Sequence, residues 1–530
     1  MESARRKTWL FASLLLPLIL QGCGTNPVTG KREIQFVSES DEIQMGTQNY
    51  APARQSEGGD YAVLPELTAY VNEVGQKLAA ASGQITVSER HLPYEFKVLN
   101  NSVPNAWALP GGKISVNRGL LTELNNEAEL AAVLGHEIVH AAARHGAQAQ
   151  ERGTLLQGGL AAAQIGAAIG GLDEQIAGLV IGGASVGAQL VHTKYGRDAE
   201  LQADLYGTRL MKAAGYDPAA AVTLQETFVR LSQGRKENWL EGLFASHPPS
   251  QERVNRNRET VAQLGTGGEL GKDRYVAKVA PLRQMKPAYD KYDQAMVAFQ
   301  KKDTAAAKSL AAEAARMAPR EGTFQQLLGD IAVNEKHFQQ ALPYYERAQE
   351  LNPGYFGSWL GAGVAQYNLK DKSQAEQSLK HSMDLMPTAP AALFLGNIAR
   401  DRGDKDSALK YYQAAAQADG SVGEAASAEA AKIDLARNPA SYLAAGLRNG
   451  SDGHPVLVVQ NRATVPVSAI VVTPVMVNGS GQIVQQARSV SIKGPLGAGQ
   501  QILADPGLSN LTPEQLATVR VRIDSAQLSQ

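Results

Sequence analysis

The sequence predicts a multidomain chain with three architectures in series. An α+β, mainly helical domain comes first, an all-α superhelix of repeated helix pairs follows, and a small β-sandwich ends the chain. Three observations predict this order: a metal-binding pattern on an amphipathic helix, a 34-residue spacing of small residues and prolines, and short apolar stretches between turn residues near the C-terminus. A chain of 530 residues is long enough for three or four domains.

The metal-binding pattern is His136-Glu137-Ile138-Val139-His140. Histidines four positions apart on a helix project from one face, so both can reach a single zinc ion. Glu137 between them can lie beside a metal-bound water and accept its proton. Asn126 and Glu129 form an N-x-x-E capping pattern, apolar residues follow at helical spacing, and Gly146 is a typical helix end. A core helix without metal is the alternative, but it would bury polar groups without partners.

A catalytic zinc site needs a third protein ligand. Ala143 and Gly146 stand seven and ten residues after His136, which excludes the metzincin pattern of a glycine and a histidine at these positions. Glu200 is the best candidate for the third ligand. Asp204 lies one turn later on the same face, where it can accept an imidazole N–H and fix the tautomer of a ligand histidine. Taken alone, this acidic pair would be an ordinary solvated helix face.

Four segments, in this order and spacing, resemble a known family. They are Asn105 to Ile114, His136 to His140, Glu200 to Asp204, and Ser246-His247-Pro248-Pro249 with Arg253. Over about residues 30–260 they are similar to the gluzincin metallopeptidases that include HtpX and BepA, and most similar to BepA-like periplasmic proteases with helical repeats. The resemblance implies a zincin-type metalloprotease domain over residues 23–262. One zinc ion per chain would be held by His136, His140 and Glu200, with Glu137 as catalytic base.

The resemblance also implies a substrate-binding edge strand beside the active-site helix. Pro110-Gly111-Gly112 is a typical turn, and the residues from Ile114 onward alternate between apolar and polar. An exposed edge can receive an extended substrate by strand addition, whereas a plain hairpin would have no such role. The residues expected at this edge are Ala108, Gly111, Gly112 and Ile114.

His247 and Arg253 gain possible roles only through the resemblance, because a lone Ser-His-Pro segment is usually a turn. In BepA-like relatives the corresponding histidine can approach the zinc as a regulatory or fourth ligand, and the arginine faces the active site. Arg253 would then be catalytic, stabilising the oxyanion of the tetrahedral intermediate. Pairing of Arg253 with a structural carboxylate is the alternative.

The N-terminus predicts a lipoprotein signal peptide over residues 1–22. Arg5-Arg6-Lys7 precede an apolar run from Trp9 to Leu20 that is too short to span a bilayer. Leu20-Gln21-Gly22-Cys23 resembles a bacterial lipobox, and Cys23 is the only cysteine. Its lipidation would leave a mature protein without thiols, which suits an oxidising periplasm. Gly24, in place of an aspartate that would retain the protein at the inner membrane, favours the outer membrane; an uncleaved signal anchor is the alternative.

The composition of the chain argues against one class of partner. The net charge is −1 and no basic stripe is present, which argues against nucleic acid as a partner.

The segment from Gly153 to Val191 is rich in glycine and alanine. We interpret it as a helical hairpin packed through small residues, since neither half has the ~20 strongly apolar residues of a membrane-spanning helix, which is the alternative.

A helical repeat follows a glycine-rich linker over residues 263–285. Small residues and prolines recur at spacings of 33 or 34 residues: Pro319, Pro353 and Pro387; Ala307, Ala341, Ala375 and Ala408; Gly329, Gly363 and Gly396. Small residues let paired helices pack closely, and proline ends each second helix. This is the tetratricopeptide pattern, over residues 286–420. The concave face of such a superhelix binds peptides or partner proteins, unless the array is only a spacer.

After a helical linker over residues 421–451, residues 452–530 predict a small β-sandwich. Its expected strands are short apolar runs separated by Asn, Gly and Pro: Val456–Val459, Val465–Val472, Val490–Ile492 and Val519–Ile523. BepA-like proteases lack such a domain, so the resemblance gives it no role.

Together these patterns indicate a lipid-anchored zinc endopeptidase at the periplasmic face of the bacterial outer membrane. The resemblance implies a part in quality control or assembly of outer-membrane proteins. Substrates would be unfolded or misassembled envelope proteins, recruited by the repeats, and the outer-membrane assembly machinery is a candidate partner. The alternative is a chaperone or adaptor of outer-membrane assembly whose protease site is latent.

Overall fold

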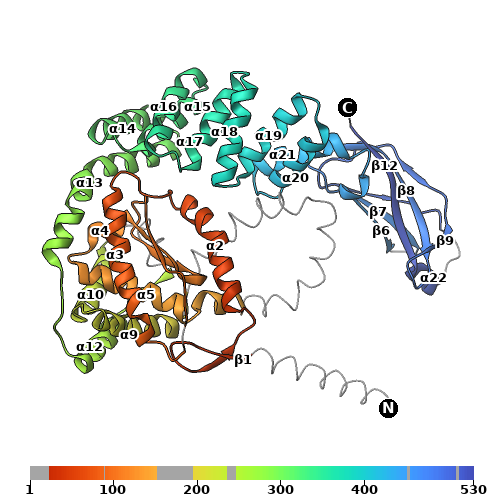
Figure 1. Cartoon of the computed structure of the whole chain (residues 1–530). Coiled ribbons are helices and arrows are strands. Elements are labelled where there is room, and N and C mark those ends of the chain that lie inside the picture. Colours follow the sequence, from red (N-terminus) through yellow and green to blue (C-terminus); the bar gives the residue numbers. More distant parts are fainter. Residues whose placement is uncertain are drawn as a thin grey trace, which may run out of the picture. The chain divides into compact units, whose positions relative to one another are not determined.

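The computed structural model describes residues 23–88, 90–151, 195–234, 246–450, 454–508 and 512–529 (Figure 1). These residues form two compact units, one up to Pro387 and the other from Thr388 onward. The predicted signal peptide and the whole Gly/Ala-rich segment lie outside the described residues. Within the described part of the chain, no helix combines the length and apolarity needed to cross a membrane.

The first unit begins with two small sheets and several helices. Its strands and helices up to residue 142 are β1 (Cys23–Thr25), β2 (Arg32–Ile34), α2 (Glu39–Ser56), α3 (Pro65–Ala81), β3 (Glu95–Leu99), β4 (Ala106–Leu109), β5 (Lys113–Asn117), α4 (Arg118–Glu123) and α5 (Glu127–Ala142). β1 and β2 form an antiparallel pair. The other three strands form a sheet in the order β3-β5-β4, in which β5 is parallel to β3 and antiparallel to β4.

The predicted substrate edge is only partly correct. Ala108 lies on β4, which is an edge of this sheet, and Gly111 and Gly112 form the following turn with φ of 76° and 81°. Ile114, however, lies on the central strand β5, between Phe96 of β3 and Ala108 of β4. Both sides of its strand are already paired, so Ile114 cannot lie at a free edge. The turn follows the edge strand instead of leading into it.

The helix that carries the histidine pattern starts where the sequence predicts. The side chain of Asn126 accepts a hydrogen bond from the backbone N–H of Glu129, as an N-cap does. The carboxylate of Glu129 reaches past the N-cap and accepts from the backbone N–H of Asn125 at 2.8 Å. The helix ends at Ala142, one turn before the predicted Gly146, and Arg144 then takes a left-handed conformation with φ of 63°. This early end reverses the chain directly after the histidine pattern.

Helices α9 (Arg197–Ala213), α10 (Ala219–Gly234) and α12 (Gln251–Leu264) complete the domain. Glycines set the close approach of α5 to α9. A Cβ atom at Gly207 would lie 3.0 Å from the backbone nitrogen of His136, and one at Gly135 would lie 3.3 Å from the carbonyl oxygen of Gly207. Because neither residue has a side chain, α9 can bring its own acidic residues against the histidines of α5.

A long helix precedes the repeat helices and begins within the predicted linker. The glycine-rich stretch ends at Gly271, and Lys272 starts α13 (Lys272–Gln300), so much of the predicted linker is helical. It is followed by α14 (Thr304–Met317), α15 (Gly322–Asn334), α16 (Phe338–Leu351), α17 (Phe356–Asn368) and α18 (Lys372–Leu385). The periodic small residues hold the helix pairs together: Ala307, Ala341 and Ala375 are fully buried, and Gly329 faces the ring of Tyr345. The helical repeats are therefore confirmed.

The first repeats are bonded directly to the preceding domain within the same unit. Glu321, the N-cap of α15, is buried and accepts hydrogen bonds from Tyr289 Oη at 2.6 Å and Asn100 Nδ2 at 3.0 Å. Gln55 of α2 donates to the carbonyl of Gly354 at 2.7 Å. The contacts of Asn100 with Glu321 and of Gln55 with Gly354 join residues more than 200 positions apart, so the first repeats and the metal-site domain form one body.

The second unit contains a helical part and a β domain. Its elements are α19 (Ala389–Asp401), α20 (Lys405–Ala415), α21 (Ser421–Asp434), β6 (Leu443–Asn449), β7 (Pro455–Asn461), β8 (Val467–Val477), β9 (Ile483–Gln486), β10 (Val490–Ile492), β11 (Gln501–Ala504), α22 (Pro513–Ala517) and β12 (Val519–Leu528). One antiparallel sheet has the order β10-β8-β12, with β9 also on β8, and the other has the order β11-β7-β6.

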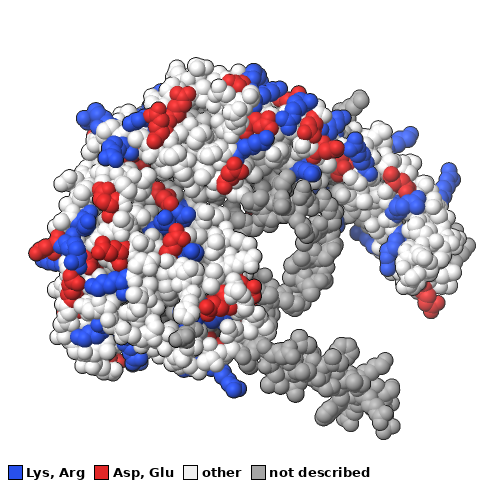
Figure 2. Space-filling view, in the orientation of Figure 1, with Lys and Arg blue, Asp and Glu red and all other residues white. Residues whose placement is uncertain are grey.

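The two sheets share one hydrophobic core, as a sandwich requires. Leu457 and Val459 come from the β7 sheet, whereas Ile470 and Val472 come from the β8 sheet. The predicted β-sandwich is confirmed, but it begins at Leu443 instead of residue 452. On the face shown in Figure 2, acidic and basic residues are interspersed, which agrees with a net charge of −1.

Candidate metal centre

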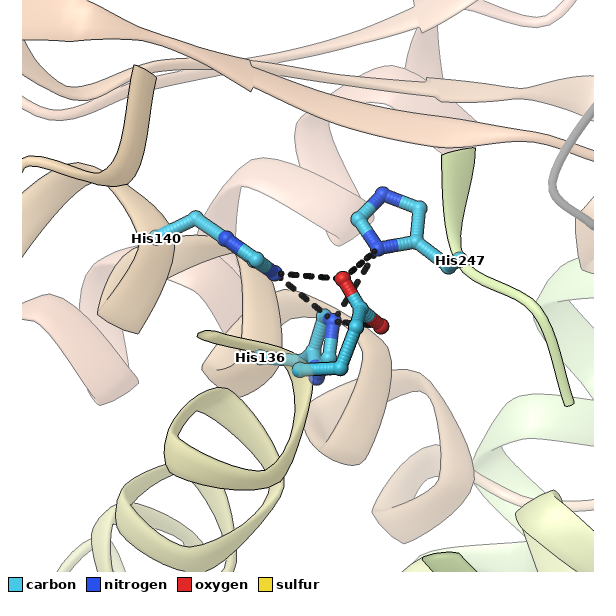
Figure 3. A group of neighbouring side chains, drawn as sticks. His136, His140 and His247 are labelled. Atoms are coloured by element: carbon cyan, nitrogen blue, oxygen red, sulfur yellow. Dashed lines mark hydrogen bonds and ion pairs between the residues drawn. The ribbon is translucent and has the colours of Figure 1, made fainter. Parts of the chain in front are cut away.

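Four buried donor groups converge between α5, α9 and the start of α12. His136 and His140 come from α5, Glu200 from α9 and His247 from the segment that leads into α12 (Figure 3). Their ligand atoms all lie within 4.8 Å of one another. The sequence therefore predicted the members of a cluster that the fold brings together from positions 111 residues apart.

The spacing of these donors fits a tetrahedral metal ion. His136 Nε2 lies 3.0 Å from His140 Nε2 and 3.3 Å from His247 Nδ1. Glu200 Oε1 lies 2.9 Å from His247 Nδ1 and 3.4 Å from His140 Nε2. A tetrahedral ion with ligand bonds of about 2.1 Å has donor–donor edges of about 3.4 Å. Three imidazoles and one carboxylate are also a donor set suited to a divalent transition metal or zinc.

Asp204 fixes the orientation of His136. Its Oδ1 lies 3.0 Å from His136 Nδ1, so the imidazole carries its proton on Nδ1 and turns the lone pair of Nε2 toward the cluster. Arg253 in turn holds Asp204 through two hydrogen bonds of 2.7 Å, and its third nitrogen lies 2.9 Å from Glu200 Oε2. Of the two arrangements considered for Arg253, the structure shows the pair with structural carboxylates.

Charge neutralisation keeps both carboxylates of α9 ionised. Burial is the largest influence on the pKa of Asp204 and would raise it, but the charge and hydrogen bonds of Arg253 bring the pKa below its usual value. Burial likewise opposes ionisation of Glu200, yet the charge of His247 brings its pKa well below the usual range. Both groups therefore present anions to the cluster.

Glu137 has a different environment. Burial raises the pKa of its carboxyl group. Its Oε1 lies 3.7 Å from His247 Nε2, and its Oε2 is buried without a hydrogen-bond partner among the described residues. An oxygen in this position has a free lone pair beside the cluster, as a proton acceptor needs.

Sequence reasoning missed three residues around His140. His145 Nδ1 lies 2.9 Å from His140 Nδ1, and His145 Nε2 lies 2.9 Å from Gln202 Oε1. The ring of Tyr195 stacks on the ring of His140, with centroids 4.0 Å apart and an angle of 24°. No helical spacing connects His145 with His140, because the helix ends between them and the chain reverses at Arg144.

A small cavity of about 30 Å³ adjoins the cluster. His136 and Glu137 line one side of it, and apolar side chains from α5 and α10, including Val133, Leu224 and Phe228, line much of the rest. Gln225 also faces the cavity, and its buried Oε1 has no hydrogen-bond partner among the described residues. The cavity can take a small, mostly apolar group next to Glu137.

The surrounding fold agrees with a known peptidase family. Residues 65–261, which contain the whole cluster, match the model of "Peptidase family M48". This chain belongs to peptidase family M48. Residues 292–355, 327–390 and 389–421 match tetratricopeptide repeat models. The family and the repeats predicted from the sequence are thereby confirmed, and the four donor groups form a candidate metal site that is typical of this family.

Several curated proteins are similar to part of this M48 chain. The mitochondrial metalloendopeptidase OMA1 of Schizosaccharomyces pombe is 34% identical over 45% of this chain and 66% of its own length. In Escherichia coli, metalloprotease YcaL is 29% identical over 44% of this chain and 92% of its own length. The β-barrel assembly-enhancing protease of the same species is 28% identical over 50% of this chain and 53% of its own length. The chain thus spans about half to two thirds of two of these relatives.

Solved structures also match part of this chain. The crystal structure of MamA protein aligns with 27% of this chain and 78% of its own chain, at 16% identity and a TM-score of 0.24.

Proposed function

We propose that this M48 protein is a zinc-dependent endopeptidase. The observation that carries the proposal is the convergence of His136, His140 and Glu200 beside Glu137, whose Oε2 is buried and has no hydrogen-bond partner among the described residues. A helix that serves only as core would pair this oxygen, because an unpaired buried polar atom costs about 1–3 kcal/mol. A proton acceptor next to three metal ligands explains why the oxygen is left without a partner.

In the proposed reaction, the zinc ion and the residues of the protein have different roles. When bound, zinc would polarise the scissile carbonyl and acidify the attacking water. His136, His140 and Glu200 would hold it, and Asp204 would keep His136 in the ligating tautomer. Glu137 would accept the proton of the water at Oε2 and deliver it to the leaving amine. The cavity lined by Val133 and Leu224 would receive a substrate side chain and exclude water around the reacting bond.

His247 supports a resting state in which proteolysis is off. Its Nδ1 lies at the fourth corner of the donor cluster, where a water or substrate would otherwise bind. We propose that His247 occupies this corner at rest and leaves it by a motion of its segment. The same observation favours the second candidate function, a chaperone or adaptor with a latent protease site.

We further propose that the protein acts in the bacterial cell envelope on unfolded or misassembled proteins. The similarity to a β-barrel assembly-enhancing protease supports this, as do the tetratricopeptide repeats, which suit recruitment of substrates or of outer-membrane assembly machinery. The lipobox-like sequence ending in Cys23 supports a lipid anchor at the periplasmic face of the outer membrane.

The experiment for the catalytic proposal compares Glu137→Gln with wild type on an unfolded protein substrate, using zinc-loaded full-length protein. We expect cleavage to fall at least 10²-fold, because the amide cannot accept the proton. Glu346→Gln is the matched control, since Glu346 is exposed on α16, and it should cleave as wild type does. Equal cleavage by Glu137→Gln and wild type would contradict the proposal.

The lipid anchor has its own test. Cys23→Ser should leave an unlipidated precursor, because only the thiol can carry a diacylglyceryl group. Mass spectrometry of the N-terminus and membrane fractionation in a bacterial host measure this. Identical N-terminal masses and fractionation for wild type and variant would refute the anchor.

A further inference from the structure

The second zinc-binding histidine of the proposed site, His140, needs a partner for its other nitrogen. If Nε2 is to bind a metal, the proton of the neutral ring must lie on Nδ1, and a buried N–H needs an acceptor. Asp204 provides this acceptor for His136, but no carboxylate contacts Nδ1 of His140 among the described residues. The atom that faces it is Nδ1 of His145, at 2.9 Å.

The protonation of His145 is set from its opposite side. Its Nε2 lies 2.9 Å from Gln202 Oε1, and an amide oxygen can only accept. The proton of a neutral His145 therefore lies on Nε2, which leaves Nδ1 as an acceptor for the N–H of His140. The chain of hydrogen bonds runs from His140 through His145 to Gln202, and each donor points toward Gln202.

The packing leaves His140 little freedom to choose another partner. Its side chain is fully buried, and the ring of Tyr195 stacks on it. His145 is also buried. Arg144, which reverses the chain between these histidines, is held by an ion pair with Glu42 and a hydrogen bond of 2.8 Å to the carbonyl of Val37. The reversal that brings His145 back onto His140 is therefore anchored independently of the metal site.

We propose that His145 and Gln202 are a positioning pair that fixes His140 in its ligating tautomer, an inference that rests on the proposed metal site. Helix α9 would then serve both histidines of α5. Asp204 contacts His136 directly, and Gln202 acts on His140 through His145. The ligand Glu200 lies on the same helix, two residues before Gln202. Helix α9 would thus supply one metal ligand, Glu200, and also the groups that fix the tautomers of the two histidine ligands on α5.

The test measures zinc affinity by competition with a chelator in the full-length protein, with zinc alone as the probe. His145→Phe keeps an aromatic ring but removes both nitrogens, and it should weaken zinc binding about 10- to 100-fold. Gln202→Leu should weaken it in the same direction, whereas Gln202→Glu keeps an acceptor oxygen and should bind nearly as wild type does. Because the two residues act in series, the His145→Phe/Gln202→Leu double variant should bind no more weakly than His145→Phe alone.

Two comparisons keep this test decisive. His337→Phe is the matched control, since His337 has a side chain that is 52% exposed at the start of α16, and it should leave zinc affinity unchanged. If His145→Phe does not fold, the half-buried Gln202 still allows Leu and Glu to be compared in folded protein. If both His145→Phe and Gln202→Leu bind zinc as tightly as wild type does, the proposed positioning pair is wrong, but the proposed metal site is unaffected. Failure of wild type itself to bind zinc would instead overturn the proposed function.

Discussion

Arg253 and Asp204 form a buried ion pair with two parallel contacts, Nε to Oδ2 and Nη2 to Oδ1, each of 2.7 Å. Through Asp204 this pair reaches His136, and through Nη1 the same guanidinium reaches Glu200. Arg253 therefore contacts one proposed ligand and the partner of another. A single cation that contacts two buried carboxylates is placed to hold the site together.

The first prediction concerns Arg253. Arg253→Met should lower the free energy of unfolding by about 3–5 kcal/mol and reduce zinc content, because Asp204 would stay buried without its counter-charge. Arg253→Lys should lose less, since it keeps the charge but not the two-contact geometry. Urea unfolding and metal analysis measure both effects. Loss of turnover alone, with stability and zinc unchanged, would favour an oxyanion role for Arg253 instead.

The second prediction concerns His247. His247→Ala should raise basal cleavage of an unfolded substrate while zinc stays bound through the three remaining ligands, because it opens the fourth corner of the cluster. A degradation assay with parallel zinc analysis measures this. If His247 instead assists catalysis by a hydrogen bond to the oxyanion, the same change should lower activity by about 10²- to 10³-fold. The two hypotheses therefore predict opposite changes in the cleavage activity of His247→Ala.

The third prediction concerns the contact between the first repeats and the metal-site domain. Glu321→Ala should destabilise this unit by about 1–3 kcal/mol, because the half-buried Asn100 amide and the buried Tyr289 hydroxyl both lose a hydrogen bond to this carboxylate. Thermal or urea unfolding measures the effect. Glu346→Ala removes an exposed carboxylate from α16 and serves as the control. Equal unfolding of the two variants would show that the Glu321 contact contributes nothing.

The fourth prediction concerns pH and the repeats. Burial raises the pKa of Asp330 from 3.8 to about 6, against hydrogen bonds from Tyr345 and Gln326 that oppose the shift. The folded protein thus binds more protons than the unfolded chain between about pH 4 and pH 6, so this group's contribution to stability falls as pH rises through that window. Asp330→Asn should therefore be more stable than wild type at pH 7.

Melting temperatures across pH test this prediction. The difference between Asp330→Asn and wild type should shrink as pH falls from about 6 and should level off only below about pH 3, where wild-type Asp330 is protonated in both the folded and the unfolded state. Other titrating groups cancel in the difference. A constant difference from pH 7 to pH 4 would contradict the shift.

The spacing of residues along the chain was enough to predict the features that depend on helical geometry and on sequence repetition. His136 and His140 are four apart on one helix, and the alanines of the repeats recur at 34-residue intervals, so both follow from local rules. Glu200 became a candidate because zinc chemistry demands a third ligand. The fold then explains its position through the close contact of α5 with α9 at Gly135 and Gly207.

Contacts that depend on chain reversal or on non-local pairing were not visible in the sequence. His145 meets His140 only because Arg144 turns the chain back, and Gln202 meets His145 only in the folded domain. Ile114 was misplaced because strand order in a sheet is set by pairing with distant β3. Strand β6 was missed because Leu443–Asn449 has no β-branched or aromatic residue, so its pairing with β7 overrides weak local preference.

The central claim is that the cluster is a zinc site with Glu137 as its base, and zinc stoichiometry tests it most directly. Wild type and Glu137→Gln should each bind one zinc per chain, since Glu137 is not a ligand. His136→Ala and Glu200→Ala should lose the metal, because each removes one of the three permanent ligands of the proposed site and His247, which leaves the cluster by a motion of its segment, does not replace it. Metal analysis that found one zinc per chain in His136→Ala would contradict the account.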